Sequence, residues 1–234
     1  MVGFLFMDNS EMLKMIRDRD DLLRHVKGIL DARERRILPR DNLRASAVLV
    51  PLSWKENEPS VIVTKRSMTV EHHKGEISFP GGRAEETDRD IFFTALREAE
   101  EEIGLKPDDV DVIGLLDDHI SIMGYHITPV VGAVPYPYHF SINSESETIL
   151  CVPLAAALSE TAWMGERTTF MGQGITIYYL EIDGGVVWGA TGRMLKHFAD
   201  LIAGRPLPFS KVTPEAKAWV TDLLAVQTGL YGKG

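Results

Sequence analysis

Residues 97–105 concentrate carboxylates in a pattern that could hold a metal ion. The segment reads Arg-Glu-Ala-Glu-Glu-Glu-Ile-Gly-Leu, with four glutamates in five residues. On a helix of about 100° per residue, Glu98, Glu101 and Glu102 fall within roughly one third of the circumference, where their charges repel one another. Hard divalent cations prefer carboxylate oxygens and would relieve this repulsion. These three glutamates are therefore candidate ligands of a divalent cation.

The segment that carries them has the features of a helix packed on a core. An apolar arc beside the carboxylates is formed by Phe92, Ala95, Leu96, Ala99 and Ile103. This spacing predicts a helix over residues 89–103, ended by Gly104. Shortly before it, Phe79-Pro80-Gly81-Gly82 predicts a tight turn where the backbone can approach a ligand closely. The alternative, a solvated acidic helix face, does not explain why these features occur together.

Together these residues resemble the Nudix box, which reads Gly, five residues, Glu, seven residues, Arg-Glu, an apolar residue, any residue, Glu-Glu, any residue, Gly and an apolar residue. The helical half matches without a gap from Arg97 to Leu105. The front half differs, because Gly82 lies 15 residues before Arg97, one more than in the pattern. The acidic residue six positions after Gly82 is Asp88 rather than Glu. We interpret the difference as a one-residue insertion before the helix.

The resemblance implies an α/β Nudix fold, in which a mixed β-sheet is sandwiched between helices, here with extra N-terminal and C-terminal helices. It also implies metal-dependent hydrolysis of a nucleoside diphosphate linked to another moiety. The implied metal ligands are Glu98, Glu101, Glu102 and the Gly82 carbonyl. Ligation by oxygen alone favours Mg²⁺ or Mn²⁺, since zinc sites usually include Cys or His. Arg97 is expected to orient a glutamate through an ion pair.

Residues 62–82 are similar to a signature of coenzyme A pyrophosphatases within the Nudix group. Ile-Val-Thr-Lys-Arg-Ser at 62–67 is followed at the expected spacing by Gly75 and by Phe-Pro-Gly-Gly at 79–82. The resemblance implies that coenzyme A or a CoA derivative is cleaved to 3′,5′-ADP and 4′-phosphopantetheine. Glu71 occupies the position of the signature arginine, which would suit bidentate phosphate recognition. The candidate substrate-binding residues are Arg66, Lys74, Gly82 and Arg83.

Because Glu71 departs from the signature, other substrates stay open: ADP-ribose, NADH, dinucleoside polyphosphates or oxidised nucleotides. A Nudix-fold nucleotide-binding module without catalysis is a further alternative. The density of carboxylates at Glu98, Glu101 and Glu102 argues against it, since a pure binder has no need of them.

A base that activates water must be a box glutamate or a loop carboxylate. Glu145 lies where the CoA subfamily often has a loop glutamate, and Glu147 competes with it. Both could instead be exposed loop acids. His119 and His126 are expected to have structural or solvent-facing roles. Four aromatic residues could stack on adenine, although core filling is the commoner role: Tyr125, Tyr178, Tyr179 and Trp188.

Composition narrows the classes of protein and of partner. The chain has 234 residues, 44% of them hydrophobic, which fits one sizeable core. A formal net charge of −9 argues against a general nucleic-acid binder. No apolar run approaches the roughly 20 residues of a membrane span. Cys151 is the single cysteine, so an internal disulfide is excluded, and a cytoplasmic location and a core position near a strand are predicted. The expected partner is a small nucleotide-derived substrate, and a homodimer is left open.

We predict an N-terminal helical extension at 1–43, a Nudix hydrolase domain at 44–204 and a C-terminal helical extension at 205–234. Residues 10–34 are predicted to form one amphipathic helix with Ser10 as N-cap. The basic connector that follows is interpreted as a solvated linker, or else as a contributor to phosphate binding: Arg33, Arg35, Arg36, Arg40 and Arg44. Strands are predicted at 45–52, 60–64, 110–116, 127–134, 168–171, 175–182 and 186–188, helices at 155–158, 191–202 and after Thr213, and a loop at 136–147.

Overall fold

The computed structural model describes residues 9–40, 42–55, 57–70, 73–170 and 172–227. The helices are α1 (Asn9–Arg17), α2 (Arg19–Ala32), α3 (Ile91–Ile103), α4 (Leu154–Ala157), α5 (Gly189–Ile202) and α6 (Pro214–Gln227), with a 3-10 turn η1 (Pro107–Asp109). The strands are β1 (Arg44–Lys55), β2 (Glu58–Arg66), β3 (Ile77–Ser78), β4 (Gly81–Arg83), β5 (Asp111–Leu115), β6 (His119–Ile120), β7 (Tyr125–Ala133), β8 (Ser146–Pro153), β9 (Trp163–Phe170), β10 (Gln173–Ile182), β11 (Gly185–Val187) and β12 (Ser210–Lys211).

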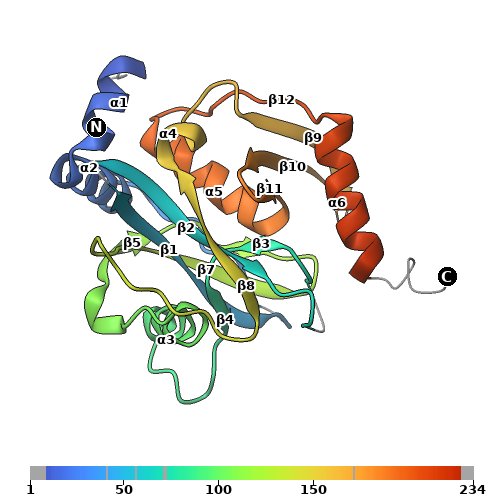
Figure 1. The fold of residues 1–234 in the computed structure, drawn as a ribbon, viewed down its shortest axis with the longest axis horizontal. Helices are drawn as coiled ribbons and strands as arrows, with labels where there is room; N and C mark the ends of the chain where they lie inside the picture. The colour runs from blue at the N-terminus through green and yellow to red at the C-terminus, as the bar shows by residue number, and fades with distance from the viewer. Residues whose placement is uncertain (1–8, 41, 56, 71–72, 171, 228–234) are drawn as a thin grey trace.

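The larger of two sheets forms the centre of the molecule. Its strand order is β3-β2-β1-β7-β5, and β8, β4 and β6 pair with β2, β1 and β7 respectively. β1 runs parallel to β7, whereas its pairings with β2 and β4 are antiparallel, so the sheet is mixed. Figure 1 shows α3 on one side of this sheet, with α2 and α5 on the other. The predicted α/β architecture, a mixed sheet between helices with additional terminal helices, is therefore confirmed.

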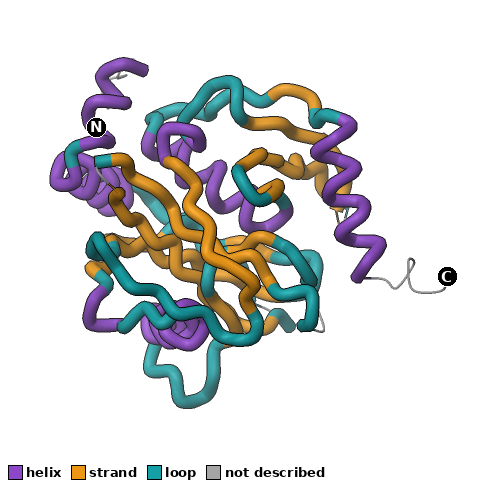
Figure 2. The backbone as a smooth tube through the Cα atoms, in the orientation of Figure 1, coloured by secondary structure: helices purple, strands orange, loops and turns teal. Residues whose placement is uncertain are grey.

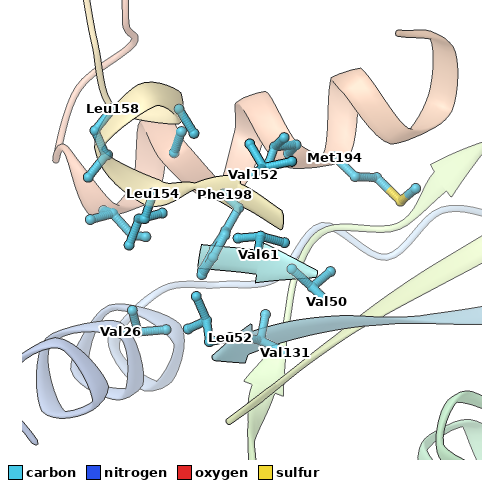
Figure 3. Close-up of a cluster of buried hydrophobic side chains, with 14 of the residues drawn as sticks. Val26, Val50, Leu52, Val61, Val131, Val152, Leu154, Leu158, Met194 and Phe198 are labelled. Atoms are coloured by element: carbon cyan, nitrogen blue, oxygen red, sulfur yellow. The ribbon is translucent and has the colours of Figure 1, made fainter. Parts of the chain in front are cut away.

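Alternate residues of the central strands serve two separate cores. On the α3 side, Ala47, Leu49 and Ile62 pack against Ala95 and Ala99 of α3. The neighbouring positions point to the other side, into a larger core that α2 and α5 complete. The labelled members of that core are shown in Figure 3: Val26, Val50, Leu52, Val61, Val131, Val152, Leu154, Leu158, Met194 and Phe198.

The C-terminal part of the chain adds a smaller sheet in the order β11-β10-β9-β12. Helix α6 stands at one side of the molecule (Figure 2) and reaches back to the larger sheet. There, Gln227 Nε2 donates to Glu76 Oε1 over 2.8 Å, just before β3. The last helix is thereby attached to the segment that resembles the CoA signature.

The N-terminal segment forms two helices, so the prediction of one continuous helix over 10–34 is wrong. The chain is extended at Asp18, whose side chain accepts a hydrogen bond from Asp21 N and caps α2. An aspartate favours this role because its short carboxylate satisfies a free N–H group of the first turn.

The prediction of a solvated linker is wrong for Arg33 and Arg35 of the basic connector, whereas Arg36, Arg40 and Arg44 are exposed. Arg33 binds the carboxylate of Asp117 and donates to Leu115 O over 2.8 Å. Arg35 binds Asp118 and donates to Leu116 O over 2.9 Å. These contacts fasten the N-terminal segment to the end of β5.

Strand β8 occupies residues 146–153, part of which is predicted from sequence as loop. It pairs with β2 and with no other described strand, so it is an edge strand. Cys151 lies on it and is exposed, which makes the predicted core position wrong. Its neighbour Val152 turns to the buried side instead. Among the described residues, no helix is both long and apolar enough to cross a membrane. The division into units at residues 43 and 204 stays a prediction.

Replacing Phe198 with Ala tests the larger core. Phe198 is 1% exposed and projects from α5 toward the sheet (Figure 3). The cavity left behind is expected to lower the free energy of unfolding by about 3–5 kcal/mol. Urea denaturation followed by circular dichroism measures the change. The matched control is Ile122→Ala, at a side chain that is 73% exposed, where a change within about 0.5 kcal/mol is expected. Equal effects at the two sites would contradict this assignment of the core.

Candidate active site

Helix α3 positions the carboxylates, and both of its ends are fixed locally. Asp90 caps the start, because its side chain accepts a hydrogen bond from Phe93 N over 2.8 Å. Gly104 ends the helix with φ of 66°, a left-handed conformation that glycine adopts without strain. The helix predicted over 89–103 and its glycine stop are confirmed, with the first turn beginning at Ile91.

Arg97 joins four parts of the site through one guanidinium group. Its Nη1 lies 3.0 Å from Glu98 Oε1 and 3.2 Å from Glu101 Oε1. Its Nη2 donates to the carbonyl of Arg83 over 2.9 Å, and its Nε lies 3.0 Å from Asp88 Oδ1. These are the contacts that a residue orienting glutamates would make.

Asp88 anchors Arg97 from the loop before α3. Its second oxygen accepts from Arg97 Nη2 over 3.1 Å, from Thr94 Oγ1 over 2.8 Å and from Glu85 N over 2.9 Å. The Arg97 guanidinium lowers the pKa of Asp88 to about 2, so the carboxylate is ionised at neutral pH. The sequence assigned this residue no role, although its place six positions after Gly82 was a signal for one.

Glu102 is the most deeply buried of the three glutamates. Its residue is 6% exposed, and its Oε2 is buried without a hydrogen-bond partner. Burial raises the pKa of Glu102 to about 8, against the favourable charge of Arg66, and the charge of Glu98 adds to the rise. Burial also raises the pKa of Glu98. Glu101 is different, since 56% of its side chain is exposed.

Gly82 on β4 leaves room for the Glu98 carboxylate. A Cβ atom at this position would lie 2.5 Å from Glu98 Cδ and from both of its oxygens. Gly82 pairs with Ala47 of β1, a residue of the core on the α3 side. The side of β4 that faces α3 therefore accepts a carboxylate because it carries no side chain there.

These residues suit a divalent cation in the type of atom they offer. The unpartnered oxygen of Glu102 and the Glu98 carboxylate over Gly82 are hard donors of the kind that Mg²⁺ and Mn²⁺ prefer. Within the described residues, no three His, Cys, Asp or Glu side chains converge as a finished metal site. Glu98 and Glu101 both pair with Arg97.

Arg66 brings a loop carboxylate to the glutamates of α3. Its Nη1 lies 3.8 Å from Glu102 Oε1 and its Nη2 lies 3.2 Å from Glu145 Oε2. The loop is also tied through its backbone, since Ser67 N donates to Glu145 O over 2.7 Å. Glu147 points elsewhere and pairs with Lys65 Nζ at 3.4 Å. Of the two loop acids, the structure therefore brings Glu145 to the site.

The other residues assigned to substrate are not joined to this cluster. The Arg83 side chain is exposed and, by strand alternation, points to the side of the sheet away from Glu98. Lys74 is half-buried, and its side chain makes no hydrogen bond or ion pair with any described residue. Glu71 and His72 lie outside the described residues.

The two histidines and the aromatic residues have roles away from the carboxylates. His126 is fully buried, with Nε2 3.1 Å from both Leu38 O and Asp118 Oδ2. Burial, followed by the charge of Arg193, lowers the pKa of His119 to about 4. The aromatic residues are in packing contacts: Tyr125 under Arg44, Tyr178 against Trp163, and Tyr179 and Trp188 in a small apolar cluster beside α6.

Comparison with known proteins identifies the family. Residues 43–167, more than half of the chain, match the model of the NUDIX domain. The chain belongs to the Nudix family. It is 36% identical to an uncharacterized Nudix hydrolase, NudL, of Cronobacter sakazakii, over 70% of this chain and 86% of that protein. It is also 36% identical to the chloroplastic Nudix hydrolase 22 of Arabidopsis thaliana, over 81% of this chain and 64% of that protein.

Among solved structures, a C. elegans Ap4A hydrolase binary complex is similar with a TM-score of 0.42 and 14% identity, over 47% of this chain and 80% of that one. A likeness this low says nothing about substrate. The family itself establishes that this Nudix protein is a pyrophosphohydrolase, which acts on small nucleotide-derived substrates by cleaving a nucleoside diphosphate derivative. Nudix hydrolases generally use divalent ions such as Mg²⁺ or Mn²⁺.

Replacing Gly82 with Ala tests the contact between β4 and Glu98. The new Cβ would displace the Glu98 carboxylate, which is the flexible end of a side chain, so the fold should tolerate the change. We expect the Mg²⁺ concentration that half-saturates activity to rise by about 10-fold to 100-fold, with little change in the urea midpoint. Gly28→Ala is the matched control, since a Cβ there meets no atom within 4 Å. Unchanged Mg²⁺ dependence in Gly82→Ala would show that the contact of Glu98 with residue 82 does not affect metal binding.

Proposed function

We propose that this Nudix enzyme hydrolyses coenzyme A or a CoA derivative to 3′,5′-ADP and 4′-phosphopantetheine. The observation that carries the proposal is the position of Arg66. This residue belongs to the segment resembling the CoA signature, and it contacts both Glu102 of the box and Glu145 of the loop. The segment that would bind the substrate therefore contacts the carboxylates that would take part in its cleavage.

The proposed metal ligands are Glu98, Glu101, Glu102 and the Gly82 carbonyl. When bound, Mg²⁺ or Mn²⁺ would neutralise phosphate charge and lower the pKa of a coordinated water. The buried Oε2 of Glu102 supports this assignment, because it has no hydrogen-bond partner while Arg66 lies 3.8 Å from the other oxygen. Arg97 would keep Glu98 and Glu101 at hand, anchored by Asp88.

We assign the general base to Glu145. Its side chain is 53% exposed, so water can reach it, and Arg66 holds it beside Glu102. In the reaction, Glu145 would accept a proton from the water whose oxygen attacks phosphorus, while the bond from that phosphorus to the bridging oxygen breaks. The exposed Arg83 and the half-buried Lys74, together with Arg66, are the proposed cationic contacts of the phosphates. A cytoplasmic location accompanies the proposal.

A substrate panel combined with Glu102→Gln tests the reaction. The purified wild type with Mg²⁺ should release 4′-phosphopantetheine from CoA, with a higher kcat/KM than for ADP-ribose, NADH, a dinucleoside polyphosphate or an oxidised nucleotide. Glu102→Gln should lower kcat by more than about 100-fold while the affinity for 3′,5′-ADP stays within about threefold. Glu100→Gln is the control, because Glu100 is an exposed neighbour in the same glutamate run.

Two other results of the substrate panel would change the proposed function. A higher kcat/KM for another substrate would overturn the CoA assignment while leaving the hydrolase intact. Absence of turnover on every substrate, together with nucleotide binding, would favour the alternative of a binding module.

The assignment of the base is tested by comparing Glu145→Gln with Glu147→Gln. Loss of a general base should lower kcat by about 10²-fold to 10⁴-fold in the first variant. The second should stay within about threefold of wild type, because Glu147 pairs with Lys65 instead. Steady-state kinetics at saturating substrate and Mg²⁺ measures both. Equal, small effects would transfer the role of the base to a glutamate of the box.

A further inference from the structure

A cavity of about 380 Å³ lies beside α5, apart from the carboxylates of α3. Its walls come from segments that are distant in the sequence: residues 116–119, the strand β10 and the helix α5, with Arg36 of the connector at one side. Ile175 supplies apolar surface, and the buried side chains of Leu116 and Met194 lie behind the wall. Tyr178 adds an aromatic ring, held edge-on against Phe209 at 5.4 Å between centroids. Such a lining suits an organic ligand with a flat apolar part and a charged group.

The acidic residues of this cavity are all neutralised by neighbouring cations. Asp117 is bound by Arg33, and its other oxygen lies 3.5 Å from His197 Nε2. Asp118 is bound by Arg35 and contacts His126. Asp200 is paired with the buried Lys196 at 2.6 Å.

Two arginines of the cavity have no acidic partner among the described residues. Arg36 and Arg193 are exposed at the cavity, and neither guanidinium group has a hydrogen bond or ion pair with any described residue. His197 Nε2 is buried without a hydrogen bond and lies 3.5 Å from Asp117 Oδ2, so this nitrogen faces the aspartate. The unbalanced charge of the cavity is therefore positive, and its free donors suit an anion with several oxygens, such as a phosphate group. We call it the arginine cavity.

The register of the larger sheet places the arginine cavity on the face to which Arg83 points, which is the face opposite to Glu98. His119, which lines the cavity, is paired with Ile127 of β7. Ile127 is paired with Ser46 of β1, and Ser46 is paired with Arg83 of β4. Because paired residues point to the same face, Arg83 and His119 share one face of the sheet, three strand spacings or about 14 Å apart. A nucleotide-sized ligand spans such a distance.

We propose that the arginine cavity binds the phosphomonoester-bearing nucleoside end of the substrate, with Arg36 and Arg193 pairing with the phosphate. The diphosphate would then reach the carboxylates of α3 around β4, which pairs with β1 and with no other described strand, and Arg83 would lie between the two sites. This inference rests on the proposed function, since CoA carries a 3′-phosphate on its adenosine. The CoA-like signature lacks its arginine, because Glu71 occupies that position. The proposal assigns phosphate recognition to Arg36 and Arg193, which lie outside the signature.

Direct binding tests the cavity without catalysis. The probes are 3′,5′-ADP and 5′-AMP, titrated calorimetrically into the protein without divalent metal. Wild type should bind 3′,5′-ADP about tenfold or more tightly than 5′-AMP, because two charge-assisted pairs form with the extra phosphate. The Arg36→Gln/Arg193→Gln variant should lose this preference. The control is Arg17→Gln/Arg40→Gln, which removes the same charge from exposed positions away from the cavity.

Kinetics with CoA and dephospho-CoA supplies the second measurement. The Arg36→Gln/Arg193→Gln variant should raise KM for CoA about tenfold while leaving KM for dephospho-CoA and both kcat values within about threefold. Equal changes for the two substrates, or an equal effect of the control variant, would overturn the proposal. So would a wild type that does not distinguish 3′,5′-ADP from 5′-AMP. Failure of wild type to hydrolyse CoA would instead overturn the proposed function, with the binding measurement still deciding the cavity.

Discussion

The arrangement of the carboxylates on helix α3 depends on the Arg97 guanidinium. Four like charges in five residues would spread apart on an isolated helix, and the buried ones would tend to protonate. Arg97 compensates for this repulsion at Glu98 and Glu101, and Asp88 fixes Arg97 in turn. The same group holds the carbonyl of Arg83, so α3 and β4 are joined by one planar fork of donors. Arg97 therefore both offsets the repulsion among the carboxylates and fixes their positions.

The parts of the fold that follow from local sequence were predictable. Helix α3 was recognisable from its apolar spacing and Gly104, and the mixed sheet from the Nudix resemblance. The break at Asp18 was not recognised, because the helical pattern continues on both sides of it. Strand β8 was missed because an edge strand with polar residues at its start resembles a loop, and the same exposure explains Cys151.

Long-range pairings set the limit of prediction at the site. Arg66 and Glu145 are 79 residues apart, so this pair could not be named from sequence spacing. The arginine cavity is the extreme case, since Arg36, residues 116–119, β10 and α5 meet only in the folded chain. Chemistry carried by one helix could be inferred from the sequence, whereas recognition distributed over four segments needed the structure.

The contacts of Arg33 and Arg35 have a consequence for the electrostatics of the whole molecule. Asp117 and Asp118 line the arginine cavity, and these two arginines of the N-terminal segment neutralise them. Without that segment, Asp118 would be a buried charge lacking its guanidinium partner, a costly state for any fold. The cavity would also lose Arg36 and change from attracting anions to repelling them. A segment outside the family motif thus sets the sign of the net charge at a surface built by the rest of the chain.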